Sequence, residues 1–165
     1  MGNPIISQAL VRDRARDLER QAADSRKAHQ RVSDHLSTVG LFANCGRREL
    51  RAIAKSAKIV NVHNGTQIIT EGEEGNTMYV ILDGSARVSR AGRRLATIGA
   101  GDSFGELALL SKGPRTATVV ATSDIEAAII TRRQLNGLLE DAPAFARKLL
   151  EALAGIVREL DKKVV

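Results

Sequence analysis

Between Lys58 and Ile130, short runs rich in Val, Ile and Thr alternate with turns that contain glycine. Connections this short leave no room for the crossover helices of a parallel sheet. Asp83 and Gly84, between two apolar runs, are a strong hairpin signal. The pattern therefore predicts an antiparallel barrel or jelly roll. The expected strands are Lys58–Val62, Gln67–Thr70, Met78–Leu82, Ala86–Ser89, Arg94–Ile98, Arg115–Ala121 and Ile125–Ile130.

Helical patterns precede the strand region. Residues 5–38 lack Gly and Pro and are rich in good helix formers, but their apolar positions are too sparse for a helix that faces a core throughout. Two interpretations stay open: a solvated, partly frayed arm, or a helix that docks a partner or a second copy of the chain. Residues 39–57 predict a shorter helical unit, with Gly46 at the N-cap and Glu49 three residues later.

Helices also follow the strands. Thr131 and Gln134 have the spacing of a capping box, and Asp141 and Pro143 mark the start of the last helix. We divide the chain into a charged helical extension, residues 1–38, and a domain, residues 39–165. The last helix has two apolar flanks, so we expect one to pack on the domain and the other on a partner. Its apolar residues are Phe145, Leu149, Leu150, Leu153, Ile156, Val157, Leu160 and Val164.

Charge and composition narrow the function classes. The net charge is +6, but acidic residues are interleaved with the basic ones, which favours an ordinary solvated surface over a nucleic-acid interface. Aromatic residues make up only 2 %, which disfavours stacking platforms for single-stranded nucleic acid. The single cysteine, Cys45, permits no internal disulfide and suits a reducing compartment. We find no signal peptide, membrane-spanning run or metal-ligand spacing, and we expect a cytoplasmic protein without metal or cofactor.

The segment Gly101–Val119 combines three features. A glycine-rich turn leads into a short helix at Gly105, Glu106 stands at the helix start, and Arg115 opens the next strand after Pro114. N–H groups at a helix start attract anions, and an arginine fork suits phosphate oxygens. Glu106 can accept a hydrogen bond from a sugar hydroxyl. The segment thus predicts a sugar-phosphate site; the alternative is a structural salt bridge between Glu106 and Arg115.

The sequence FGELALLSKGPRTATV resembles the phosphate-binding cassette of cyclic nucleotide-binding domains. That family includes kinase regulatory subunits, gated channels and bacterial catabolite-activator regulators. The preceding EGEEGNTMYVILDGSARV is similar to the family's turn and hairpin, with Gly72, Gly75 and Gly84 at its usual glycine positions. The resemblance covers about residues 39–160. It implies a mainly β fold, a double-stranded β-helix (jelly roll) of about eight antiparallel strands with helices before and after it.

The resemblance also implies roles for individual residues. Glu106 would bind the ribose 2′-hydroxyl and Arg115 the cyclic phosphate, which the N–H groups of Ala108 and Thr116 would also reach. In the family, threonine at position 116 often favours cGMP, although many such members bind cAMP; we expect cAMP and keep cGMP as the alternative. The implied ligand-binding residues are Phe104, Gly105, Glu106, Leu107, Ala108, Pro114, Arg115, Thr116 and Ala117.

We therefore expect a stand-alone receptor that senses a cyclic nucleotide and does not act as an enzyme. The last helix would close over the base through Leu153, Ile156 or Val157 and so switch an effector protein, while its other flank could form a homodimer. The alternatives are a transcription regulator and a scaffold that has lost its ligand. Regulators of this family carry a helix-turn-helix after the last helix, and the chain ends at Val165, so DNA binding is the minor expectation. A match to the hydrolase elbow at Gly101–Gly105 has no histidine after it, so we expect no catalytic residue.

Overall fold

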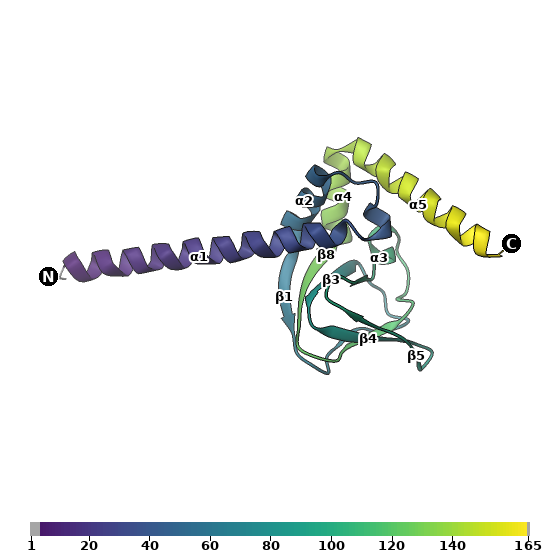
Figure 1. Ribbon diagram of the computed structural model, residues 1–165, viewed down its shortest axis with the longest axis horizontal. Helices are drawn as coiled ribbons and strands as arrows, with labels where there is room; N and C mark the ends of the chain where they lie inside the picture. The colour runs from purple at the N-terminus through teal and green to yellow at the C-terminus, as the bar shows by residue number, and fades with distance from the viewer. Residues whose placement is uncertain (1–3, 165) are drawn as a thin grey trace.

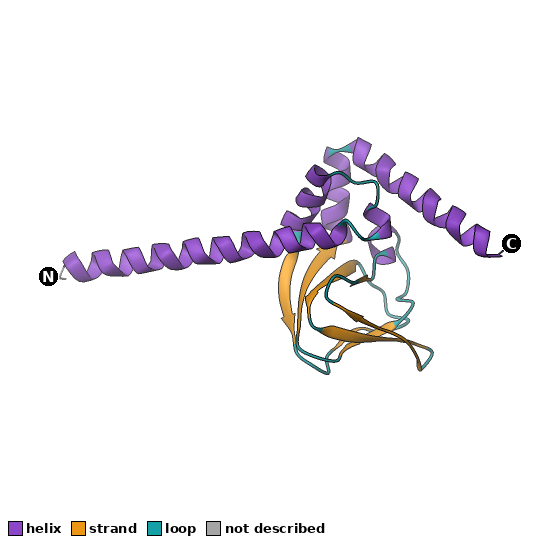
Figure 2. Ribbon diagram, viewed as in Figure 1, coloured by secondary structure: helices purple, strands orange, loops and turns teal. Residues whose placement is uncertain are grey.

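The computed structural model describes residues 4–164, and the side chains of residues 8–164. Eight strands in this part of the chain are preceded and followed by helices (Figures 1 and 2). The helices are α1 (Pro4–Leu36), the 3₁₀ turn η1 (Gly40–Phe42), α2 (Arg47–Ser56), α3 (Leu107–Leu110), α4 (Arg132–Asp141) and α5 (Pro143–Val164). The strands are β1 (Lys58–Val62), β2 (Gln67–Ile69), β3 (Thr77–Asp83), β4 (Ser85–Arg90), β5 (Arg93–Gly99), β6 (Ser103–Phe104), β7 (Thr118–Ala121) and β8 (Ile125–Thr131).

The strands form two four-stranded antiparallel sheets, with the orders β1-β8-β3-β6 and β2-β7-β4-β5. The two sheets face each other and together form a roll. Most of the helices lie together on one side of this roll (Figure 2). The predicted mainly β fold with helices at both ends is therefore confirmed. The hairpin predicted at Asp83-Gly84 is wrong: β3 pairs with β6 and β8, whereas β4 pairs with β5 and β7. This turn instead carries the chain from one sheet to the other.

Two hydrophobic cores meet at strand β3. Met78, Val80 and Leu82 face the helices, whereas Ile81 faces the inside of the roll, because successive side chains of a strand point to opposite faces. The strand is thus buried on both faces, which explains its nearly continuous apolar sequence. The core inside the roll consists of small and aliphatic side chains and Phe104. It supports the wall of the cavity described below.

Helix α1 is continuous from Pro4 to Leu36, two residues short of the predicted end. Only its last turns join the domain, where Val32 and Leu36 are fully buried. The preceding part projects far from the roll (Figure 1), and Leu18 there is exposed. The helical prediction is confirmed, whereas docking of a partner on α1 stays a prediction.

Helix α5 is anchored at its beginning only. Phe145, Leu149 and Ala152 are buried against the helical core, whereas Val157 and Leu160 are exposed. Beyond its first turns the helix extends away from α4 (Figure 1). The predicted N-terminal caps of α2 and α4 are present, and they fix where these helices begin. Among the helices of residues 4–164, none has the length and apolarity needed to cross a membrane.

Three further local predictions need correction. Strand β6 was not expected, because it has only two residues and pairs with the distant β3. Strand β7 begins at Thr118 rather than Arg115, since the Arg115 side chain bonds to Thr77 and its backbone belongs to the preceding loop. Helix α3 is shorter than Gly105–Leu110 and begins at Leu107, with Glu106 at its N-cap.

Candidate ligand-binding site

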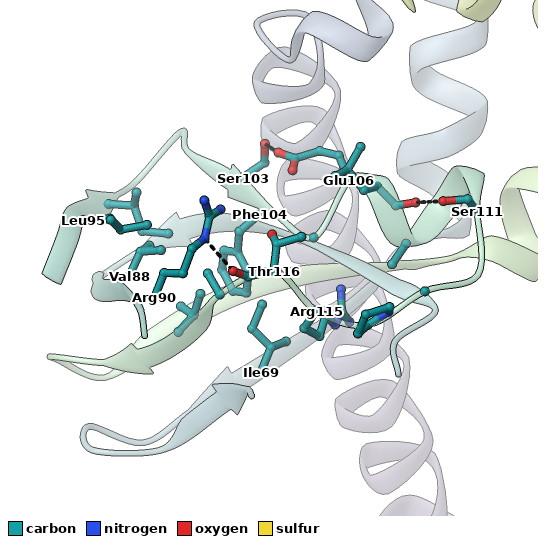
Figure 3. A pocket seen from close by; sticks show the side chains of 18 residues that line it. Ile69, Val88, Arg90, Leu95, Ser103, Phe104, Glu106, Ser111, Arg115 and Thr116 are labelled. Carbon is teal, nitrogen blue, oxygen red and sulfur yellow. Dashed lines mark hydrogen bonds between the residues drawn. The ribbon is translucent and has the colours of Figure 1, made fainter. Parts of the chain in front are cut away.

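A cavity of about 350 Å³ opens in the roll beside α3 (Figure 3). Its volume lies within the usual range of small-molecule sites. The nine residues predicted to bind ligand all lie on its wall, so the fold brings the two ends of the cassette together. No cluster of three or more His, Cys, Asp or Glu that could hold a metal ion occurs in the described chain.

Arg115 forms one end of the cavity. Its Nη1 donates to the Thr77 carbonyl oxygen and its Nη2 to Thr77 Oγ1, both at 2.8 Å. The guanidinium is half-buried, and burial lowers the pKa of Arg115 from its ordinary value because desolvation disfavours the charged form. No carboxylate of residues 8–164 forms an ion pair with it. A partly desolvated cation held this way gains most from an anion in the cavity.

Two glycines make room for this guanidinium. A Cβ atom on Gly75 would lie 2.1 Å from Arg115 Nε, and one on Gly105 would lie 2.7 Å from Nη1. Gly105 also has a φ of +84°, a conformation that other residues rarely adopt. Two of the glycines in the segments that carry the family resemblance, Gly75 and Gly105, therefore have a local cause, namely the close passage of Arg115.

Glu106 points away from Arg115 (Figure 3). Its Oε1 accepts a hydrogen bond of 2.6 Å from Ser103 Oγ, and no ion pair joins it to Arg115. The alternative of a structural salt bridge between these two residues is therefore wrong. Ser103 fixes the orientation of the Glu106 carboxylate. The second oxygen of this carboxylate, Oε2, stays available to a ligand hydroxyl.

The backbone donors of the cassette are not equally free. The Ala108 N–H donates to the Gly105 carbonyl oxygen at 3.1 Å, so a phosphate would have to share or displace this bond. The Thr116 N–H makes no hydrogen bond within the described chain. Of the two amides predicted to reach phosphate, Thr116 is the one available without rearrangement.

The other end of the cavity is apolar and more open. Val88 and Leu95 come from β4 and β5, and Leu107 comes from α3. Leu95 is 53 % exposed and Leu107 63 % exposed. A flat apolar group could lie between them, although nothing in the described chain covers it. Leu153, Ile156 and Val157, expected to close over a base, do not line the cavity.

Helix α5 instead lies against η1, where Ile156 Cδ1 is 3.5 Å from the position of a Cβ on Gly40. The sequence shows which apolar residues the helix has, but the direction in which α5 leaves the domain is set by tertiary packing. The expected contact of these residues with a base is therefore not present in this conformation.

A comparison with family models decides what kind of domain this is: residues 59–142 match the model described as "Cyclic nucleotide-binding domain". The chain belongs to the cyclic nucleotide-binding domain family. The match runs from β1 to the start of the α4–α5 junction and so includes the whole cavity wall. The resemblance in the cassette is thereby confirmed at the level of the family.

Relatives of the domain occur in regulators of several kinds. The CRP-like cAMP-activated global transcriptional regulator of Mycobacterium tuberculosis is 28 % identical over 138 residues, which are 81 % of this chain and 62 % of the relative. The cAMP-dependent protein kinase regulatory subunit of Yarrowia lipolytica is 39 % identical over 82 residues, 50 % of this chain and 22 % of the relative. The chain thus spans about three fifths of the length of the mycobacterial regulator.

A solved structure shows the same fold. The N-terminal domain of a transcriptional regulator from Streptomyces coelicolor A3(2) superposes with a TM-score of 0.72 at 28 % identity, over 78 % of this chain and 95 % of that one. All three of these relatives are described as regulatory proteins or parts of them. The domain therefore has regulatory relatives that differ in the output they control.

Arg90 lies on the cavity wall and was missed by the sequence analysis. It is the last residue of β4, and its Nε donates to the Thr116 carbonyl oxygen at 2.7 Å. Alternation along β4 could have indicated it, because Ala86, Val88 and Arg90 face the same side of the strand, although Arg90 itself is exposed. An arginine beside a hairpin turn is normally solvated, so the sequence alone gives no reason to place Arg90 at a cavity.

Proposed function

We propose that this domain is a receptor for a cyclic purine nucleotide, cAMP or cGMP, and that it does no chemistry on the ligand. The observation that carries the proposal is the state of Arg115. A guanidinium that is half-buried, enclosed by two glycines and without an acidic partner in the described chain is prepared for an anionic ligand. The family membership supports a cyclic phosphate as this anion.

In this proposal, the nine cassette residues bind different groups of the ligand. Arg115 binds the cyclic phosphate together with the Thr116 and Ala108 amides, and Glu106 binds the ribose 2′-hydroxyl. Phe104 stacks on Tyr79 at a centroid distance of 4.9 Å and so holds the strand that leads into the cassette. Gly105, Leu107, Pro114 and Ala117 complete the wall around the sugar and the base.

Signalling requires that the ligand binds one conformation of the protein better than another. We assign this change to α5, whose end is exposed and not yet in contact with the cavity. Closure of α5 over the base would change the surface offered to an effector protein. Exposed Leu150, Val157 and Leu160 would serve this contact or a homodimer, which sedimentation velocity of the whole chain can distinguish.

The second candidate function is the sensory part of a transcription regulator, favoured by the relatives from Mycobacterium tuberculosis and Streptomyces coelicolor. Binding of the chain to duplex DNA, with and without ligand, tests it. Contacts to phosphates weaken as salt increases, so binding at low salt that falls steeply with salt would support this function. Absence of binding at low salt would leave the receptor function and remove direct DNA binding.

Thermal unfolding with cAMP, with cGMP and without ligand tests the receptor function. A ligand at 100 times its Kd stabilises the folded state by about 2.7 kcal/mol, which corresponds to a rise in Tm of roughly 5–10 °C for a chain of this size. Arg115→Ala is expected to abolish the rise, because the charge-assisted bond to phosphate is lost.

Arg133→Ala is the matched control, since Arg133 is an exposed arginine of α4 that does not line the cavity. It is expected to keep the wild-type response to nucleotide. If neither nucleotide raises the Tm of the wild-type protein, or if Arg115→Ala responds as the wild type does, the proposed function is wrong.

A further inference from the structure

Arg90 lines the cavity but belongs neither to the cassette nor to the turn that precedes it. It lies beside Val88 and Leu95, whereas Arg115 lies at the other end of the cavity (Figure 3). The cavity therefore has two cations with different surroundings: Arg115 between Thr77 and two glycines, and Arg90 on an apolar wall. Because they lie at opposite ends, a ligand whose single phosphate is at Arg115 presents a different group to Arg90.

The Arg90 side chain is exposed, and one hydrogen bond orients it while part of its donor capacity stays unused. Its Nε bond to the Thr116 carbonyl oxygen, 2.7 Å long, ties it to the cassette. Its two Nη groups make no hydrogen bond or ion pair with the residues that the structure describes. They form a planar pair of donors, and arginine has no acceptor. Such a pair selects a flat group that presents two adjacent acceptors.

A cyclic nucleotide offers one group of this kind. With its phosphate at Arg115, its base extends toward the apolar end formed by Val88 and Leu95. Guanine presents two acceptors, O6 and N7, on one edge, whereas adenine has an amino donor in place of O6. An adenine edge facing Arg90 would bring two donors together and leave one of them unpaired.

We infer that Arg90 reads the base and gives the domain a preference for guanine over adenine. The inference rests on the proposed function, because it concerns the same cavity and the same class of ligand. It makes cGMP, rather than the cAMP expected from the sequence alone, the preferred ligand. The Nε bond to Thr116 holds the fork in position before the ligand arrives, which limits the entropy lost on binding.

Calorimetric titration with cGMP, cAMP and cyclic IMP tests the inference. Cyclic IMP keeps O6 and N7 but lacks the 2-amino group that Thr116 could contact, so it isolates the edge assigned to Arg90. We expect the wild-type protein to bind cGMP and cyclic IMP about tenfold more tightly than cAMP, equivalent to ~1.4 kcal/mol. Arg90→Ala is expected to bring the three affinities within about threefold of one another.

Two further variants make the experiment specific. Arg90→Lys keeps the charge but lacks the planar fork, so it should lose most of the preference as well. Arg87→Ala is the matched control: Arg87 is an exposed arginine of the same strand, on the opposite face, and it should keep the preference. Thermal unfolding without ligand verifies that each variant is folded.

A wild-type preference for cAMP, or a guanine preference that persists in Arg90→Ala, would overturn the inference and leave the receptor function standing. Equal losses for all three nucleotides in Arg90→Ala would assign Arg90 to the phosphate or the ribose and would also overturn it. If the wild-type protein binds no nucleotide at all, the proposed function fails, and the inference fails with it.

Discussion

The two ends of the cavity differ in how completely they are formed in the absence of ligand. At one end, Thr77 holds Arg115, and Gly75 and Gly105 make room for its guanidinium beside the backbone. At the other end, Leu95 and Leu107 are more than half exposed. The phosphate end is thus built before ligand binds, whereas the base end is completed only when something covers it.

This difference follows from the chemistry of the two ligand groups. A phosphate needs donors in fixed directions, and fixing them in advance reduces the entropy lost on binding. A purine base needs apolar contact, which is non-directional and can be supplied by a moving element. The domain can therefore hold a ligand at its rigid end and use the open end to report that the ligand is bound.

The largest expected effect comes from disturbing the rigid end through a residue that touches no ligand. In Gly75→Ala the new Cβ would lie 2.1 Å from Arg115 Nε, so the guanidinium must shift while the backbone can stay. A charge-assisted hydrogen bond contributes roughly 1.5–3 kcal/mol, so we expect nucleotide affinity to fall by about tenfold or more. Calorimetric titration measures the loss.

The control for this substitution is Gly137→Ala, because Gly137 lies in α4 with open space around it. It should stabilise the helix by about 0.5–1 kcal/mol and leave affinity unchanged. Unaltered affinity in Gly75→Ala would show that the exact position of Arg115 does not limit binding, and the contrast between the two ends would lose its basis.

Much of the rigid end could be predicted from the sequence, because its signals are local. Gly105, Glu106 and Arg115 lie within one short segment of the sequence. The capping-box spacing of Thr131 and Gln134 also indicated where α4 begins, and the structure has this bond. Such features depend on neighbours in the chain, so the order of residues is enough to indicate them.

The open end was harder to predict, because tertiary packing forms it. Arg90 comes from β4, Leu95 from β5 and Leu107 from α3, and no spacing in the sequence shows that they meet. The course of α5 depends on how Phe145 packs at its start, so its residues were expected at the cavity although they lie elsewhere. Strand β6 was missed for the same reason, because its two residues form a strand only by pairing with β3, which is distant in the sequence.

A smaller effect is expected at the link between the cavity and the helices. Arg132, the first residue of α4, donates to the carbonyl oxygens of Ala108 at 2.7 Å, Gly75 at 2.9 Å and Ser111 at 3.2 Å. It therefore joins α3 and the residue that follows it, Ser111, to α4, the helix that precedes α5. We expect Arg132→Met to lower nucleotide affinity only by roughly fivefold, the equivalent of about one net hydrogen bond.

The informative measurement on Arg132→Met is amide hydrogen exchange with and without nucleotide. In the wild-type protein, ligand should change exchange both at the cavity and in α5; in the variant, the change at the cavity should remain and that in α5 should disappear. Arg133→Met, at the next position, should behave as the wild type. A ligand-dependent change in α5 that survives in Arg132→Met would show that the signal reaches the open end by another route.

The smallest expected effect concerns the anchor of α5. Lys148 Nζ donates to Glu49 Oε1 at 2.6 Å, and this bond, followed by the Gly46 N–H bond to the same carboxylate, lowers the pKa of Glu49. A lowered folded-state pKa means that the pair stabilises the fold above the unfolded value of about 4.3, and that the contribution is lost as the pH falls through the folded pKa. Because the pair is partly exposed, we expect less than about 1 kcal/mol.

Urea unfolding of wild type and Glu49→Gln between pH 7 and pH 3 measures this contribution. The variant should be less stable at pH 7, and the difference should shrink as the pH falls below about 4.3, where the wild-type carboxylate also becomes protonated. Glu151→Gln, which removes an exposed pair with Arg147 on the same helix, should change stability less. A difference for Glu49→Gln that stays constant across this range would mean that the carboxylate charge does not hold α5. The start of α5 would then be fixed by Phe145 and Leu149 alone, and the helix could pivot toward the open end of the cavity more freely than its ion pair suggests.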